Sequence, residues 1–221
     1  MTFSRTIPAT SSLALALFCG AVQAQAAESG GKPMVTLQMP ATPDPARVTL
    51  DPKTTALMVL DYVEPICNSQ PTCKGQMLSA MTPFMERVRK AGLVVAYGTR
   101  EQNMTKWLKE VAPAPSDIKV ISSAQDRFYN TDLDQALKAK GIKTLIMVGW
   151  KISGSITYTS VGAMVRDYTV VIPMDTTSAG SGYETTIGFY NVLNSGNANL
   201  TNEPLKPKAV TLTRTDMITF Q

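Results

Sequence analysis

The chain has no histidine among its 221 residues. This absence excludes Ser-His-Asp and Cys-His catalytic sets, and it excludes zinc sites built with imidazole. Acid–base chemistry near neutral pH must then come from carboxylates, lysines, tyrosines or bound water with shifted pKa values. We expect no metal and no other cofactor.

Long apolar runs and clusters of positive charge are also missing. No segment is long enough to span a bilayer, and the 21 Lys and Arg residues are scattered among 17 Asp and Glu residues, for a net charge of +4. Because no basic stripe with interleaved aromatic residues is present, nucleic-acid binding is not expected. A small-molecule ligand or substrate is the expected partner.

Residues 1–26, MTFSRTIPATSSLALALFCGAVQAQA, have the pattern of a secretory signal peptide. One arginine precedes an apolar run, and small residues follow it. We expect cleavage after Ala24 or Ala26 and a periplasmic or secreted protein that is not held in the membrane after cleavage.

Only two of the three cysteines lie beyond this leader, in the segment EPICNSQPTCKG. Cys67 and Cys73 close a short polar loop, and their spacing is wider than that of a C-x-x-C redox motif. In an exported protein this pair is expected to form a disulfide.

Residues 27–53 are rich in proline, glycine and polar residues, which predicts an extended N-terminal arm with a short strand near residues 34–38. Residues 54–221 alternate strand and helix patterns and form the predicted domain. The predicted strands are 54–61, 93–99, 119–122, 144–150, 168–175 and one within 209–220; the predicted helices are 75–91, 103–110, 131–141, 153–167 and 183–193. This alternation predicts an α/β fold with a parallel sheet covered by helices on both faces.

Polar residues follow several of these strands, where parallel α/β folds bind ligands. They are Asp61, Arg100, Ser122 with Ser123, the turn 151–155, and Asp175. We interpret Asp175 as a residue that satisfies backbone N–H groups of the next turn.

Four segments in this order resemble the isochorismatase-like hydrolase superfamily, also called the cysteine hydrolases. They are TTALMVLDYVEP, APSDIKVISSAQDRFYNTDLDQAL, KGIKTLIMVGWKISGSITYTSVGAMVRDY and VVIPMDTTSA, and the likeness spans about residues 54–215. The resemblance implies a three-layer Rossmann-like fold with a six-stranded parallel sheet, and a homo-oligomer.

Most members of that superfamily use an Asp–Lys–Cys triad. Position by position, the aspartate corresponds to Asp61, the lysine to Ser122 (or Ser123), and the cysteine to Ser155. The resemblance also implies a cis peptide near Trp150–Lys151. Two of the three catalytic positions have therefore changed, and an alcohol is much harder to ionise than a thiol.

Three interpretations remain open. In the first, favoured interpretation the standard chemistry is lost, and a pseudoenzyme keeps a small-molecule pocket whose expected lining is Arg100, Arg127, Tyr129, Trp150, Ser153 and Gly154. In the second, an active hydrolase of amide or ester substrates uses Ser155 as its nucleophile and Lys151 as the base. Asp61 orients the lysine, and backbone N–H groups of residues 153–155 stabilise the oxyanion. In the third, Asp61 protonates an enol ether without a covalent intermediate.

Overall fold

The computed structural model describes residues 36, 38–101 and 104–221. The chain divides into two units, residues 1–40 and 41–221, and the fold described below is that of the second. The predicted signal peptide and most of the predicted strand at residues 34–38 lie outside the described residues. Within them, no helix has the length and apolar character needed to cross a membrane.

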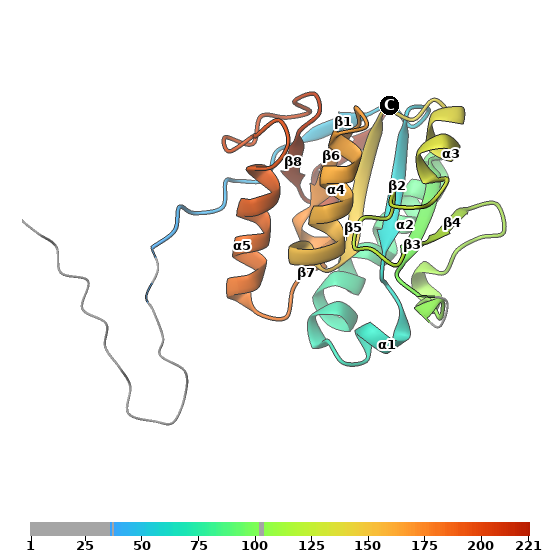
Figure 1. The fold of residues 1–221 in the computed structure, drawn as a ribbon, viewed down its shortest axis with the longest axis horizontal. Helices are drawn as coiled ribbons and strands as arrows, with labels where there is room; N and C mark the ends of the chain where they lie inside the picture. Colours follow the sequence, from blue (N-terminus) through green and yellow to red (C-terminus); the bar gives the residue numbers. More distant parts are fainter. Residues whose placement is uncertain (1–35, 37, 102–103) are drawn as a thin grey trace, which may run out of the picture. The chain divides into compact units, whose positions relative to one another are not determined.

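The strands and helices alternate as the sequence predicts (Figure 1). The strands are β1 (Val48–Leu50), β2 (Thr55–Leu60), β3 (Val94–Thr99), β4 (Ile118–Ile121), β5 (Thr144–Trp150), β6 (Thr169–Pro173), β7 (Thr177–Ser178), β8 (Val210–Thr213) and β9 (Ile218–Phe220). The helices are α1 (Glu64–Cys67), α2 (Leu78–Ala91), α3 (Leu133–Ala139), α4 (Thr157–Met164) and α5 (Gly182–Leu193).

The main sheet is parallel, with the strand order β4-β3-β2-β5-β6-β8. The predicted parallel α/β sheet is thus confirmed, but the sheet has seven strands rather than six, because β7 also pairs with β5. The strand β6 pairs with only the first half of β5, up to Ile146. After the single helical turn Met174–Thr176 the chain continues in the same direction, and the two residues of β7 pair in parallel with Gly149 and Trp150 at the far end of β5.

Helices cover both faces of the sheet, α2 on one face and α3, α4 and α5 on the other (Figure 1). Strand β2 explains the two layers, since its side chains alternate between faces. Met58 and Leu60 belong to the apolar cluster under α3–α5, whereas Leu57 and Val59 belong to the cluster under α2. All of β2 is buried, as its continuous apolar run predicts.

Two features extend this domain. Strand β1, from the predicted N-terminal arm, pairs in parallel with β9 to form a separate two-stranded sheet. The predicted disulfide between Cys67 and Cys73 is present and joins the end of α1 to the irregular helical turn Cys73–Met77.

The helix starts were the least accurate predictions. Helix α3 begins at Leu133, with Asp132 rather than Thr131 at its N-cap. The regular helix after β5 begins at Thr157 rather than Ser153, because Gly154 has non-helical angles (φ −132°, ψ −114°) within the turn Ile152–Ile156. The helix predicted near residues 103–110 is reduced to a single turn, Lys109–Val111, in the part of that segment that is described.

Candidate active site

The candidate site lies at the carboxyl ends of four neighbouring strands. Asp61 follows β2, Thr99 ends β3, Ser122 follows β4, and the turn with Ser155 follows β5. Asp61 has a left-handed backbone (φ 57°), a conformation that aspartate tolerates better than most residues, and its N–H donates to the Gly98 carbonyl. The parallel topology therefore gathers polar side chains from separate motifs at one edge of the sheet.

Gly149 allows β5 to approach the end of β2 closely. Its φ is +127°, and a Cβ at this position would lie 1.8 Å from the carbonyl oxygen of Leu60. Because only glycine fits both conditions, Gly149 sets the distance between Asp61 and the turn after β5. The Trp150–Lys151 peptide that follows is cis, as the family resemblance implied.

Arg127 is hydrogen-bonded to both Asp61 and Ser155, the positions that correspond to the aspartate and the cysteine of the superfamily. Its Nη2 donates to Asp61 Oδ2 at 2.6 Å and to Ser155 Oγ at 2.8 Å. All three side chains are buried, with residue exposures of 0% for Arg127, 3% for Asp61 and 7% for Ser155. One guanidinium therefore holds the carboxylate and the hydroxyl on either side of a single nitrogen.

The loop after β4 carries Arg127 into this position. The Ser122 hydroxyl donates to the carbonyls of Asp126 and Tyr129, which folds the loop back on itself. The backbone carbonyls of Ser122 and Ala124 accept from Arg127 Nη1. Ser122 thus shapes the loop, and the cation beside Ser155 comes from a residue five positions further along the chain.

Gly98 makes room for the arginine side chain. A Cβ on Gly98 would lie 2.8 Å from Arg127 Cγ and 2.8 Å from Met58 Cε. The absence of a side chain on β3 therefore lets the aliphatic part of Arg127 lie against the sheet. The sequence offers no direct signal of this contact.

The electrostatics of Asp61 suit a proton acceptor. Burial raises the pKa of the Asp61 carboxyl above its ordinary value of 3.8, and the opposing effect of the Arg127 charge is smaller. Within the described residues, Asp61 Oδ1, Thr99 Oγ1 and Arg127 Nε are buried without a hydrogen-bond partner. Unsatisfied polar atoms of this kind are rare in folded proteins and concentrate where function requires them.

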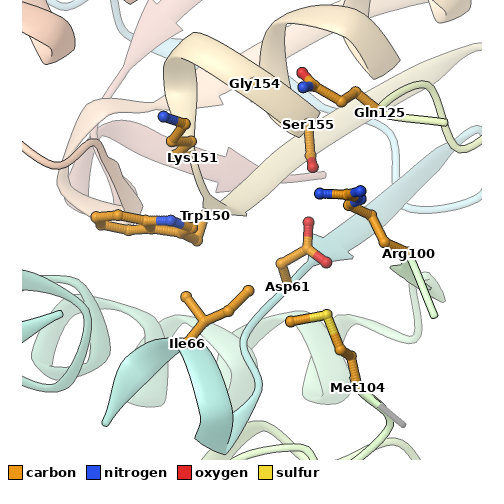
Figure 2. Close-up of a pocket in the computed structure, with 9 residues that line it drawn as sticks. All are labelled: Asp61, Ile66, Arg100, Met104, Gln125, Trp150, Lys151, Gly154 and Ser155. Carbon is orange, nitrogen blue, oxygen red and sulfur yellow. The ribbon is translucent and has the colours of Figure 1, made fainter. Parts of the chain in front are cut away.

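A cavity of about 280 Å³ opens onto Asp61 and Ser155 (Figure 2). Its lining is Asp61, Ile66, Arg100, Met104, Gln125, Trp150, Lys151, Gly154 and Ser155. The wall thus combines apolar side chains with a few polar groups, as small-molecule sites do. Ile66, Met104 and Gln125 were not among the predicted lining residues, because each lies in irregular structure or a short helix without a motif.

The structure pairs the Lys151 amine with a carboxylate and not with Ser155. Its amine pairs with Glu184 Oε1 of α5, and Figure 2 shows it directed away from Ser155. Ser153 Oγ donates to the same carboxylate oxygen at 2.5 Å, and these two partners lower the pKa of Glu184. The structure therefore assigns the cation beside Ser155 to Arg127, and neither Lys151 nor the Ser122 position supplies it.

The other predicted residues divide into two groups. Arg100, Trp150 and Gly154 line the cavity, whereas Arg127, Ser153 and Tyr129 are not part of its lining. Arg127 is fully buried, and Tyr129 is 52% exposed. The Gly154 N–H donates to the Lys151 carbonyl, so it is already used within the turn and is not the expected oxyanion donor.

Asp175 lies outside the cavity lining, and its carboxylate accepts from the backbone N–H and the hydroxyl of Thr215. It therefore satisfies a backbone N–H, but that of a distant loop rather than of its own turn. In the described part of the chain, no group of three Cys, Asp or Glu side chains is arranged to hold a metal ion.

The family model "Isochorismatase domain" matches residues 55–203. The chain belongs to the isochorismatase family. The match includes Asp61, Arg127 and Ser155 and ends before β8 and β9.

Among curated proteins, the chain is similar to ureidoacrylate amidohydrolases. It is 28% identical to the RutB protein of Stutzerimonas stutzeri over 115 residues, which is 52% of this chain and 45% of that protein. It is 23% identical to the Caulobacter vibrioides NA1000 protein over 207 residues, which is 71% of this chain and 85% of the relative. In four such relatives the match spans only 34% to 66% of the relative's length.

Solved structures of the family share the fold. The N-carbamoylsarcosine amidase of Thermoplasma acidophilum superposes with a TM-score of 0.60 at 20% identity, covering 74% of this chain and 97% of that one. A cysteine hydrolase from Pseudomonas syringae pv. phaseolicola 1448A gives a TM-score of 0.63 at 17% identity, covering 80% and 95%. At these identities the likeness is one of fold.

Proposed function

We propose that this family member hydrolyses a carbamoyl or other amide C–N bond in a small molecule, with Ser155 as the nucleophile. The observation that carries the proposal is the pair of hydrogen bonds from Arg127 Nη2 to Asp61 and to Ser155. The similarity to ureidoacrylate amidohydrolases and to an N-carbamoylsarcosine amidase supports this choice of bond.

The proposed reaction has two halves, with Asp61 moving the proton in each. Ser155 Oγ attacks the carbonyl carbon while its proton passes to Asp61 Oδ1, the oxygen left without a partner among the described residues. The C–N bond then breaks, and the leaving nitrogen takes that proton. A water molecule next attacks the acyl-serine ester and gives a proton to Asp61, which returns it to Ser155 as the acid leaves.

Arg127 does not take up a proton in this scheme, because a guanidinium group has N–H donors and no acceptor. Its contribution is electrostatic. It donates to Ser155 Oγ, so it stabilises negative charge on that oxygen, and the buried surroundings strengthen the effect. Proton transfer therefore depends on Asp61 alone.

A second candidate function, favoured by the chemistry of the hydroxyl, is ligand binding without turnover. A serine hydroxyl ionises far less readily than a cysteine thiol, and a carboxylate is a weak base for it. In this case the same cavity binds a small amide or acid, and the polar set orients the ligand only.

The test is a substrate panel of carbamoyl compounds, amides, esters, nitriles and enol ethers, assayed with the wild type and with Ser155→Ala and Asp61→Asn. We expect amide hydrolysis that both substitutions reduce by at least about a hundredfold, the scale of a nucleophile or general base. Loss only in Asp61→Asn would instead indicate acid chemistry on an enol ether. No turnover, with thermal stabilisation by a panel compound, would indicate the binding protein.

Ser155→Cys provides a matched gain-of-thiol control. Beyond the predicted leader the other two cysteines are joined in the disulfide, so the wild type is expected to resist iodoacetamide. The new thiol would lie beside the Arg127 guanidinium, which favours the reactive thiolate. Rapid alkylation of the variant, with loss of its activity, supports attack from this position. A thiol that resists alkylation contradicts it.

We also propose that the protein is exported, on the basis of residues 1–26, and the Cys67–Cys73 disulfide supports this. Expression with the native leader in a bacterium, followed by mass spectrometry of the periplasmic fraction, tests it. The expected mature chain begins at Gln25 or Ala27. An intact chain confined to the cytoplasm would contradict export. The homo-oligomer stays a prediction, which light scattering of the purified protein tests.

A further inference from the structure

In the part of the chain that the structure describes, one cation of the cavity wall has no carboxylate paired with it. Arg100 comes directly after β3 and is exposed to the cavity. In Figure 2 its side chain extends toward Asp61 and Ser155. Among residues 38–101 and 104–221, no Asp or Glu side chain forms an ion pair with Arg100.

The other two cations at the site are already paired. Arg127 Nη2 lies 2.6 Å from Asp61 Oδ2, and the Lys151 amine is paired with Glu184. Among the described residues, Arg100 is therefore the cation of the cavity wall that has no ion pair to break. The buried Arg127 and the paired Lys151 are poor candidates for binding an anionic ligand, since each would first have to break its ion pair.

We propose that Arg100 is the specificity residue of the site and that it binds a carboxylate on the substrate, while the substrate's carbamoyl or amide carbon lies at Ser155. A planar guanidinium matches a carboxylate with two parallel hydrogen bonds. One unpaired guanidinium suits one carboxylate group, and the volume of about 280 Å³ suits a small ligand. The apolar side chains of Ile66 and Met104 then contact the carbon atoms between the two ends.

This inference rests on the proposed function for the position of the scissile bond, but charge recognition can be measured without turnover. The probes are carboxylates with an N-carbamoyl group at three chain lengths, N-carbamoylsarcosine among them. Each is paired with an uncharged counterpart in which hydroxymethyl replaces the carboxylate. Turnover is measured with the wild type, and binding is measured by calorimetry with Ser155→Ala, which keeps the cavity and removes the nucleophile.

We expect the acid of at least one pair to be preferred over its alcohol. Arg100→Gln should reduce kcat/KM for that acid, and its affinity, by about ten- to hundredfold, the range for a hydrogen bond to a charged group. The alcohol should change less than about threefold. Arg100→Lys should restore part of the preference, because it keeps the charge and loses the planar geometry.

Arg47→Gln is the matched control. Arg47 is exposed and is not part of the cavity lining, so its substitution removes the same charge elsewhere. We expect it to leave the acid preference unchanged, whereas an equal loss in both variants would overturn a direct contact at Arg100.

The outcomes also separate the two proposals. Acid-selective binding that depends on Arg100, with no turnover of any probe, supports this inference and contradicts the proposed hydrolysis. Turnover that does not distinguish acids from alcohols supports hydrolysis and overturns the role of Arg100. If no probe is either bound or turned over, the inference is also overturned, because the series spans the lengths that the cavity admits.

Discussion

Replacement of Arg127 by methionine tests the ion pair at the centre of the site. The substitution leaves the Asp61 carboxylate, 3% exposed, without its cation, and it leaves the Ala124 carbonyl and Ser155 Oγ without a donor. Because both partners are almost fully buried, solvent screens their interaction only weakly. Removal of one partner of a buried pair costs about 3–5 kcal/mol. For a domain of this size, that loss lowers Tm by roughly 6–20 °C.

A double variant separates the unpaired charge from the lost packing. In Arg127→Met/Asp61→Asn the carboxylate is also removed, so we expect about 1–3 kcal/mol of the stability to return. Arg127→Met should recover the same part of its stability at acid pH. The pKa of Asp61 is already raised by burial, and loss of the cation moves it further in that direction. The unpaired carboxylate therefore lowers the free energy of unfolding fully at pH values above the pKa of Asp61 in the folded variant. This loss becomes smaller as the pH falls through that pKa, because the carboxyl group becomes protonated and neutral.

Urea unfolding followed by far-ultraviolet circular dichroism measures all three proteins. A loss below about 1 kcal/mol in Arg127→Met, or an equal loss in the single and double variants, would refute the reasoning. Either result would mean that Asp61 reaches water or another donor in solution and that the three-residue arrangement is not rigid.

Three further predictions follow from the same geometry. Gly98→Ala places a methyl group 2.8 Å from Arg127 Cγ, so we expect the free energy of unfolding to fall by about 1–3 kcal/mol. Because the methyl group displaces Arg127, kcat/KM should also fall in protein that remains folded, and unchanged kinetics would contradict this. Gly149→Ala should prevent accumulation of folded protein, because its Cβ would lie 1.8 Å from the Leu60 carbonyl oxygen, and a soluble variant with the wild-type Tm would contradict this. The pH profile of kcat/KM should fall on the acid side, with a midpoint above 3.8 that Asp61→Glu shifts, because the reaction needs ionised Asp61; a profile flat down to pH 4 would contradict this.

The sequence determined the fold and named Asp61, Ser155 and Arg127 as candidates for the site, but it did not predict the contacts of Arg127. Continuous apolar runs identify strands that are buried on both faces, and the polar residues that follow them identify the functional edge of the sheet. Asp61 was found in this way, because it directly follows β2, whereas Ser155 lies in the turn after β5 and was assigned from the family resemblance. Strand β7 was missed, because its two residues carry no pattern and pair with β5 only after an intervening helical turn, Met174–Thr176.

The tertiary structure alone decided which cation serves the site. Lys151 is close to Ser155 in sequence, but the turn after β5 directs its amine to Glu184 on α5. Arg127 is 28 residues from Ser155, in an irregular loop where no periodicity predicts the direction of a side chain. It reaches the site because Gly98, on another strand, leaves space for it and because parallel strands bring their carboxyl ends together. Sequence patterns report local conformation, whereas this contact depends on three segments that meet only after folding.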